Sequence, residues 1–250
     1  MKLFKIIGLT LVLSPLGQSF GADAGAEEDQ ARCPICYETE YTDPVTTPCD
    51  HTFCLECITA WSHGNRSCPV CRGNLDAFGA TMIHRHIRSL IVKLRSGNVP
   101  KQIAAATALC NLAANNQLAA NNQVNQDAIR EAGAIPHLVA LLQSGNYEVQ
   151  KCASKVIANL AQNNQANQDA IREAGAIPHL VALLQFGNPH LQVIASAALC
   201  NLALNNQANQ AAIIGAGAIP HLKSFIEREN LKPRVQQISP ELFLLVFPGE

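Results

Sequence analysis

The sequence predicts a two-part protein, in which a small metal-held α+β module is followed by an all-α solenoid. Three observations support this prediction. Seven Cys residues and one His fall in ligand-like spacing within residues 33–71, and a 19-residue stretch beginning at Asn125 recurs letter for letter at Asn167. Apolar residues make up 48% of the chain, yet aromatic residues only 5%. The first observation indicates a metal module, and the other two indicate stacked helical repeats.

The N-terminal residues are expected to lie outside both folded parts. Two lysines precede an apolar run from Ile6 to Leu13, and small residues with an A-x-A-like site follow near Ala24. This pattern is typical of a secretory signal peptide over residues 1–24. The apolar run is too short to span a bilayer. A disordered or amphipathic tail is the alternative, and residues 25–32 are expected to form an acidic linker.

The Cys and His residues of the metal module are enough for two tetrahedral zinc sites. Structural zinc takes four S or N ligands and leaves no position open. Three C-x-x-C pairs suit this role, because both thiolates of such a pair can reach one metal from one tight turn. A single pair could be a redox motif or a chance match, but three pairs with a Cys-x-His between them are not explained that way. The candidate ligands are Cys33, Cys36, Cys49, His51, Cys54, Cys57, Cys68 and Cys71.

The order of these ligands resembles that of the RING finger. Three Cys are followed by one His and four Cys, whereas a PHD finger has its His at the fifth position, and a U-box has no ligands. The resemblance implies a RING domain over residues 33–72 with two Zn²⁺ ions bound in cross-brace fashion. It assigns one zinc to Cys33, Cys36, Cys54 and Cys57, and the other to Cys49, His51, Cys68 and Cys71.

The same resemblance implies a function, because RING proteins of this kind act as ubiquitin-protein ligases. They bind a ubiquitin-conjugating enzyme charged with ubiquitin, and a substrate lysine attacks that conjugate directly. The implied contacts to the conjugating enzyme are Ile35, Trp61 and Pro69, for which simple packing is the alternative role. Arg72, directly after the last ligand, matches the linchpin that bridges the enzyme and ubiquitin. Its planar guanidinium suits bonds to carbonyl groups on both partners.

No covalent catalytic residue is expected elsewhere in the chain. The sequence has no Ser/His/Asp order, no phosphate-binding Gly loop and no supported carboxylate pair. Zinc ions with four protein ligands cannot activate water. Activity would therefore come from positioning another enzyme's reactive group. A non-enzymatic adaptor that uses the module only for assembly is the second hypothesis, and a secreted scaffold that never meets ubiquitin is the third.

Residues 73–84 are expected to form a connector, with Gly73 and Gly79 as breakers. From about residue 85 to residue 250 the sequence is repetitive, with a period of 42 residues. In the unit starting at Asn125 a short helix is expected to end at Gly133 in a left-handed conformation. Pro136 then lies in the first turn of a second helix. A third helix is expected over about Glu148–Gln162.

The expected third helix has one apolar face, which only stacking against neighbouring units can bury. The helix order and the Gly-Ala-Ile-Pro junction resemble armadillo repeats, of which the chain has room for about three to four. The last unit is degenerate, and its apolar segment 242–247 is expected to cover the end of the array. The apolar face in the unit starting at Asn125 consists of Val149, Cys152, Ala153, Val156, Ile157 and Leu160.

The armadillo resemblance implies a groove that takes a protein or peptide substrate. Asn111, Asn159 and Asn201 occupy equivalent positions and could hold a peptide backbone, because an Asn amide both donates and accepts. The alternative is that these residues only bridge neighbouring helices. Nuclear-import receptors carry a Trp four residues before this Asn, but Thr107, Lys155 and Ala197 stand there. Recognition of basic localisation peptides is therefore not expected.

The remaining expectations concern partners and location. The net charge is −1, so nucleic acid is only a minor alternative partner. A bacterial-looking signal on a eukaryotic-type module motivates the hypothesis of export by an intracellular bacterium, with action in host cytosol. The alternative is an ordinary cytoplasmic protein. The leading hypothesis is a RING-type ubiquitin ligase whose armadillo array recruits the substrate.

Overall fold

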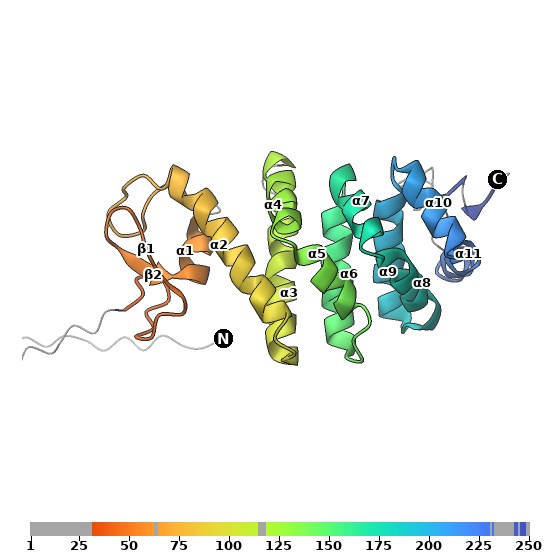
Figure 1. Ribbon diagram of the computed structural model, residues 1–250, viewed down its shortest axis with the longest axis horizontal. Coiled ribbons are helices and arrows are strands. Elements are labelled where there is room, and N and C mark those ends of the chain that lie inside the picture. The colour runs from red at the N-terminus through yellow and green to blue at the C-terminus, as the bar shows by residue number, and fades with distance from the viewer. Residues whose placement is uncertain are drawn as a thin grey trace, which may run out of the picture.

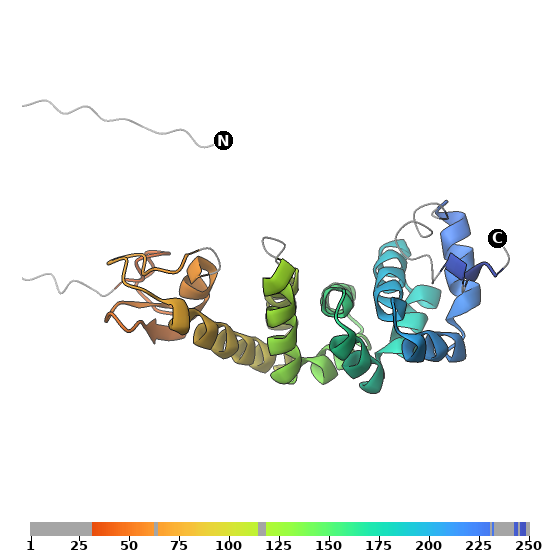
Figure 2. The same ribbon diagram turned by 90° about the horizontal axis from the view of Figure 1, so that it is seen from above.

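The computed structural model describes residues 32–62, 65–114, 119–230, 232, 243–244 and 246–248. The predicted signal peptide (1–24) and residues 25–31 of the predicted linker lie outside this part of the chain. Figure 1 shows the zinc module at one end, followed by helices stacked in a row. Figure 2 shows that the row follows an arc. No helix in the described residues is long and apolar enough to cross a membrane.

The zinc module (residues 33–72) is the α+β unit that the sequence predicts. Strands β1 (Pro44–Thr46) and β2 (Thr52–Cys54) pair in antiparallel register, with Val45 opposite Phe53. Helix α1 (Leu55–Ser62) follows β2 directly. The buried side chains Val45, Phe53, Leu55 and Ile58 form its small core. Because this core is small, we expect bound metal to supply much of the module's folding energy.

Helix α2 (Asp76–Leu94) corrects the prediction of a connector over 73–84. The helix runs through Gly79 without a break, so the expected breaker is wrong at that position. Leu75 and Met82 are buried in the core of the zinc module. One to three turns further on, the buried residues of the same helix join the core of the repeats instead. Burial in two cores outweighs the roughly 1 kcal/mol by which a mid-helix Gly disfavours a helix.

The second half of α2 is also tied to the zinc module by polar contacts. Lys93 Nζ lies 2.9 Å from Glu56 Oε1 of α1. Ser89 Oγ donates to Asp43 Oδ2 at 3.2 Å. Both pairs join residues that are 37 or more positions apart in the chain. Exposed pairs of this kind stabilise by less than about 1 kcal/mol each, so apolar burial carries most of the junction.

The repeats form the predicted series of short, medium and long helices. Gly133, Gly175 and Gly217 separate the first helix from the second in successive units, with φ of 80°, 79° and 73°. Such left-handed backbone favours Gly because it has no Cβ. An Asn side chain caps each long helix, as Asn146 does by accepting from the Val149 N–H at 3.2 Å. The helices are α3 (Val99–Ala113), α4 (Ala119–Glu131), α5 (Ala134–Leu141), α6 (Tyr147–Ala161), α7 (Gln165–Glu173), α8 (Ala176–Phe186), α9 (Pro189–Ala203), α10 (Gln207–Gly215) and α11 (Ala218–Arg228).

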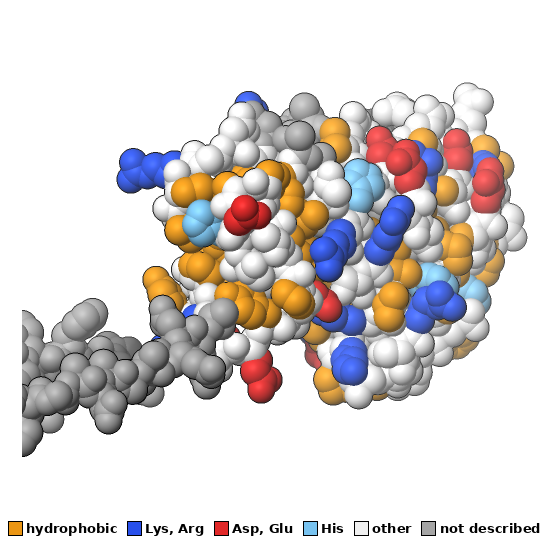
Figure 3. All heavy atoms as spheres, turned by 60° about the vertical axis from the view of Figure 1, so that its left-hand side comes forward, with side chains coloured by type: hydrophobic (Ala, Val, Ile, Leu, Met, Phe, Trp, Pro, Cys, Tyr) orange, Lys and Arg blue, Asp and Glu red, His pale blue; other side chains and the backbone are white. Residues whose placement is uncertain are grey.

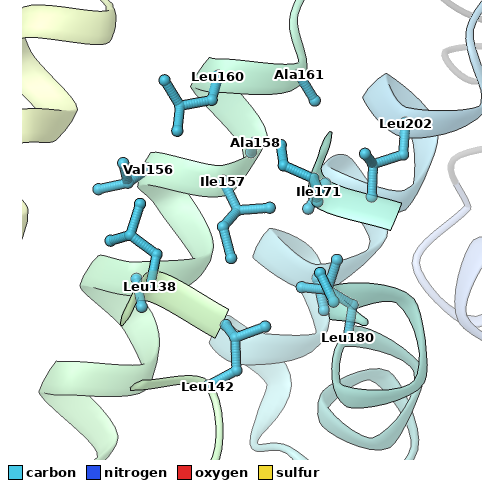
Figure 4. Packing of buried hydrophobic residues seen from close by; sticks show 14 of the residues in the cluster. Leu138, Leu142, Val156, Ile157, Ala158, Leu160, Ala161, Ile171, Leu180 and Leu202 are labelled. Atoms are coloured by element: carbon cyan, nitrogen blue, oxygen red, sulfur yellow. The ribbon is translucent and has the colours of Figure 1, made fainter. Parts of the chain in front are cut away.

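The predicted apolar face of the long helix α6 is buried along its whole length. Figure 4 shows Ile157 and Leu160 of α6 among side chains from the helices on either side, including Leu138 and Leu202. All of these belong to one continuous core. Phe243, Val246 and Phe247 join the same core, so the described residues of the C-terminal apolar segment pack onto the array as predicted. No unit buries its own face, so the repeats stabilise one another.

Buried amides form a second set of contacts between repeats. Gln168 at the start of α7 donates through Nε2 to the carbonyl of Ala161 at 3.1 Å and to that of Asn201 at 2.9 Å. Gln126 makes the equivalent bond to the Asn159 carbonyl at 2.8 Å. These bonds reach carbonyls in the last turn of a long helix or just before it, where helical partners run out. Asn164, whose Nδ2 donates to Gln126 Oε1 at 3.1 Å, and Gln168 therefore hold one unit to the next.

Candidate metal centres and partner surfaces

Both predicted ligand sets come together in the structure. In each set the four ligand atoms lie within 4.8 Å of one another. Pairs of ligands from the two sets alternate along the chain, which is the cross-brace arrangement. The N-terminal ends of the module and of helix α1 supply the first set, and the β1–β2 turn and the segment 68–71 supply the second. The sets are Cys33, Cys36, Cys54 and Cys57, and Cys49, His51, Cys68 and Cys71.

The local electrostatics favour thiolates at two of these positions. Burial alone would raise the pKa of the Cys33 thiol, but backbone N–H groups, among them that of Cys54, lower it to about 6. The Cys54 N–H lies 3.4 Å from Cys33 Sγ. Hydrogen bonds from the Thr47 hydroxyl and from His51 lower the pKa of Cys49 to about 6. Thiolates are the form that binds metal.

The residues of the second set also fit a zinc ion. His51 Nδ1 is buried and has no hydrogen-bond partner among the described residues, as expected of a nitrogen kept for a metal. A Cβ placed on Gly73 would lie 3.4 Å from Cys71 Sγ and 3.6 Å from Cys49 Sγ, so the backbone passes directly beside this set. With a first set of four sulfur donors, the module is equipped for two Zn²⁺ ions.

The three apolar side chains assigned to conjugating-enzyme binding are each partly exposed. Ile35 and Trp61 pack against the core of the zinc module with one side, and Pro69 is half-buried. Trp61 Nε1 donates to the Ser67 carbonyl at 2.8 Å, which holds the ring against the segment that carries the last two ligands. Figure 3 turns this end of the molecule forward and shows apolar side chains gathered on it.

Arg72 extends from the end of a tight turn beside the second metal set. The Arg72 N–H donates to the Cys68 carbonyl at 2.9 Å, and the Cys68 N–H donates to the Gly73 carbonyl at 2.8 Å. The turn gives Arg72 a left-handed backbone with φ of 61°, which is uncommon for a residue other than Gly. Its side chain is exposed. The guanidinium is therefore free to reach a partner while its backbone is fixed by the metal turn.

Two further exposed apolar residues adjoin this surface and were not singled out from the sequence. Tyr37, directly after Cys36, is 74% exposed, and Val70, between Cys68 and Cys71, is 48% exposed. Their exposure could have been predicted from their positions next to metal ligands. The chain around a metal is held in tight turns, which leave little room to bury large side chains. They enlarge the apolar surface around Ile35, Trp61 and Pro69.

Two of the three Asn residues of the predicted groove, Asn159 and Asn201, bond to the long helix of the preceding repeat. Asn201 Nδ2 donates to the Ala158 carbonyl at 2.9 Å. Asn159 Nδ2 lies 3.3 Å from the equivalent carbonyl, that of Cys110. Asn111, on the first long helix, is exposed. The bridging alternative is thus observed for two of the three, and each amide oxygen accepts no hydrogen bond among the described residues.

Comparison with known families decides what the two parts are. A family model described as "Ring finger domain" matches residues 31–72. A second, described as "Armadillo/beta-catenin-like repeat", matches residues 121–162 and 164–204. The chain joins a RING finger to armadillo repeats. Both assignments agree with the ligand order and with the helix triplets of the structure.

Relatives of the RING finger are found among tripartite motif proteins. Tripartite motif-containing protein 5 of Papio anubis is 39% identical over an alignment of 75 residues, which covers 27% of this chain and 15% of that protein. The protein of the same name from Macaca mulatta is 37% identical over 75 residues, with the same coverage. The chain thus spans about 15% of the length of these curated relatives, and the similarity is confined to that share.

Solved structures resemble the armadillo part. A designed armadillo repeat protein in complex with the peptide (KR)4 is 25% identical, with a TM-score of 0.55, and the match covers 70% of this chain and 66% of that one. An engineered protein is 28% identical with a TM-score of 0.56, covering 67% and 66%. The armadillo repeats only protein of Plasmodium falciparum, at 19% identity, shares the fold with a TM-score of 0.50.

Proposed function

We propose that this protein is a RING-type ubiquitin ligase whose armadillo array recruits the substrate. The observation that carries the proposal is the surface of the RING finger. Ile35, Trp61 and Pro69 leave part of their apolar area exposed beside the metal centres, and Arg72 extends from the turn that holds the last ligands. A structural zinc module needs neither an exposed apolar patch nor a fixed arginine next to it.

In this proposal the RING finger acts by docking. The apolar residues Ile35, Trp61 and Pro69 bind the conjugating enzyme, and Arg72 donates to carbonyl groups of both that enzyme and ubiquitin. Holding the charged enzyme in one geometry lowers the entropic barrier to attack by a substrate lysine. The zinc ions would be held by the eight ligands and would supply the fold of the module. No residue of this chain forms a covalent intermediate with ubiquitin.

The armadillo repeats are proposed to bring the substrate close to the RING finger. Helices α3, α6 and α9 pack side by side and present Asn111, Asn159 and Asn201 at equivalent positions. The free amide oxygens of the Asn residues could accept from the backbone of an extended peptide. The designed relative that was solved with a bound peptide makes peptide binding by this fold a reasonable expectation for the present chain.

A reconstituted ubiquitination assay tests the ligase proposal. The full chain is mixed with activating enzyme, a panel of conjugating enzymes, ubiquitin and ATP, and ubiquitin chains are followed on gels. We expect chain formation with at least one conjugating enzyme and its loss in Ile35→Ala. Val92→Ala is a matched control, because Val92 is an exposed aliphatic residue of α2 at 67% exposure. Inactivity with every conjugating enzyme, at two zinc ions per chain, would favour the adaptor instead.

The location of the protein is a separate proposal that rests on residues 1–24 alone. We infer that the signal pattern directs export and is cleaved near Ala24, so that the RING finger meets a host ubiquitin system. N-terminal sequencing of protein recovered from host cytosol tests this, and an intact Met1 there would contradict cleavage. The ligase proposal does not depend on the outcome.

A further inference from the structure

The long helices α3, α6 and α9 present their outward side chains in four rows across the array. On α6 the rows are held by Glu148, Lys151, Lys155 and Asn159, which follow the 3, 4, 4 spacing of one helical face. The equivalent side chains on α3 and α9 are exposed or half-buried as well. We name this surface the third-helix face. Its remaining members are Pro100, Ile103, Thr107 and Asn111 on α3, and His190, Val193, Ala197 and Asn201 on α9.

The acidic residues of the array lie almost entirely outside this face. Asp127 and Glu131 belong to α4 and contact Arg130. Asp169 and Glu173 belong to α7 and contact Arg172 in the same way. Surface charges that already have a partner contribute little to the field elsewhere. Each of these two short helices thus carries a net charge of −1, with both of its carboxylates beside an arginine.

One positive charge is left over on the third-helix face. Glu148, the only acidic member of the face, forms an ion pair with Lys151, whose Nζ also lies 5.3 Å from the Tyr147 ring centre. Lys155 is exposed and has no ion-pair partner among the described residues. The residues in its row, Thr107 and Ala197, are uncharged. Lys155 thus stands alone in the middle of the face.

The positive charge of Lys155 acts on the neighbouring helix α3. Burial raises the pKa of the Cys110 thiol on α3, and the positive charge of Lys155 partly offsets that rise. The ammonium on α6 therefore lies within electrostatic reach of α3. Asn159 Nδ2 lies 3.2 Å from Cys110 Sγ where the two helices meet. A ligand side chain placed there meets a cation and, one turn on, an Asn.

The α9 part of the face has a different character. Val193 is 47% exposed, Ala197 is exposed, and no Lys, Arg, Asp or Glu occurs in Pro189–Ala203. Two basic groups lie on or against α9, and both already have partners: His190 Nδ1 lies 2.8 Å from the Tyr147 hydroxyl, and Arg228, which contacts Gln192, is paired with Glu229. An ionised side chain of a ligand over Val193 and Ala197 would therefore lose water without gaining an unpaired charge. Small apolar side chains would instead cover Val193 and Ala197 at no such cost.

We propose that the third-helix face binds an extended peptide with one acidic side chain over Lys155 and small apolar side chains over α9. The inference rests on the proposed role of the array in substrate recruitment, and it specifies the class of substrate. Neighbouring helices lie roughly 8–10 Å apart, and an extended chain rises about 3.3 Å per residue. The acidic and apolar positions of the ligand are therefore separated by roughly two to three residues.

Selection from a random dodecapeptide library displayed on phage tests the proposal on the full, zinc-loaded chain. We expect the wild type to enrich sequences with Asp or Glu at one position and small apolar residues two to three positions away. Lys155→Glu should enrich Lys or Arg at that position. Lys101→Glu is the matched control with the same change of charge. Lys101 does not belong to the four rows, since the equivalent residue on α6 is the core residue Val149. It should keep the acidic preference.

Binding of one selected peptide, labelled with a fluorophore, gives the magnitude. Replacing its acidic residue by the amide, or Lys155 by Gln, should weaken binding about 2- to 5-fold, as for an exposed ion pair. A preference for basic peptides, an unchanged preference in Lys155→Glu, or no enrichment at all would overturn the inference. Ubiquitin transfer is measured on the same variants. If it persists in them while peptide selection fails, only the substrate inference falls and the ligase proposal stands.

Discussion

Gln168 shows how much of this fold depends on single buried amides. Its Nε2 reaches carbonyls of the preceding repeat and of its own repeat, while its Oε1 accepts from Asn206 Nδ2 of the next repeat at 3.2 Å. The side chain is almost fully buried. A buried polar group with all its bonds made contributes modestly, but removing it leaves several partners unsatisfied in an environment without water.

Replacing Gln168 by Ala should therefore destabilise the array by about 2–3 kcal/mol. Chemical denaturation of the zinc-loaded chain, followed by far-UV circular dichroism, measures the change in free energy of unfolding. Gln165→Ala is the control, since Gln165 is exposed on the same helix and should change stability by less than about 0.5 kcal/mol. Equal losses in both variants would show that the buried amide has no special role.

Among single residues, the sequence identified those whose spacing along the chain determines their chemical role. The eight metal ligands could be named because C-x-x-C and Cys-x-His steps leave little choice of geometry. Gln168 could not be named, because N, Q and D letters between helices are equally typical of solvated turns. The same ambiguity applied to Asn159 and Asn201, for which peptide binding and helix bridging require the same residue type. Only packing distinguishes a buried amide from an exposed one.

Helix α2 is the element that the sequence described least well. Its Gly79 suggested a connector, but Leu75, just before the helix, and Met82 enter the RING core, and Ile87 and Leu90 enter the armadillo core. Tertiary contacts on both sides thus override a weak local preference. In the unit starting at Asn125, the third helix was predicted over about Glu148–Gln162 and lies at Tyr147–Ala161, because an Asn cap marks its start. The start of α4 at Ala119 was not predicted.

Because α2 belongs to both cores, metal removal should loosen more than the RING finger. We expect zinc chelation to raise amide exchange in the first half of α2 at least about tenfold, which corresponds to a loss of about 1.4 kcal/mol of local stability. Hydrogen-exchange mass spectrometry of the chain with and without a chelator measures this. Peptides from α6 serve as the internal control and should keep their protection.

The opposite result is equally informative for this element. If the first half of α2 stays protected after both zinc ions are removed, the helix is stabilised by the armadillo repeats alone. The buried positions of Leu75 and Met82 would then contribute nothing to its stability.

At the scale of the whole molecule, the shared helix makes the RING finger and the repeats one continuous body. The buried Met82 and the Glu56–Lys93 and Asp43–Ser89 pairs join the RING finger to one face of α2. A peptide on the third-helix face would therefore be held at a fixed distance from Arg72. The two families were recognisable in the sequence, but this junction was not, because it depends on contacts between residues 37 or more positions apart.

The central claim, that the RING finger activates a charged conjugating enzyme, is tested most directly by single-turnover discharge. A conjugating enzyme carrying ubiquitin as a thioester is mixed with free lysine, and loss of the thioester is timed with and without this protein. We predict at least about tenfold acceleration, equivalent to about 1.4 kcal/mol of transition-state stabilisation. Arg72→Ala should remove most of it, while Arg88→Ala, an exposed arginine of α2, should not. Equal rates with the wild type and Arg72→Ala, or no acceleration with any conjugating enzyme at full zinc content, would contradict the claim.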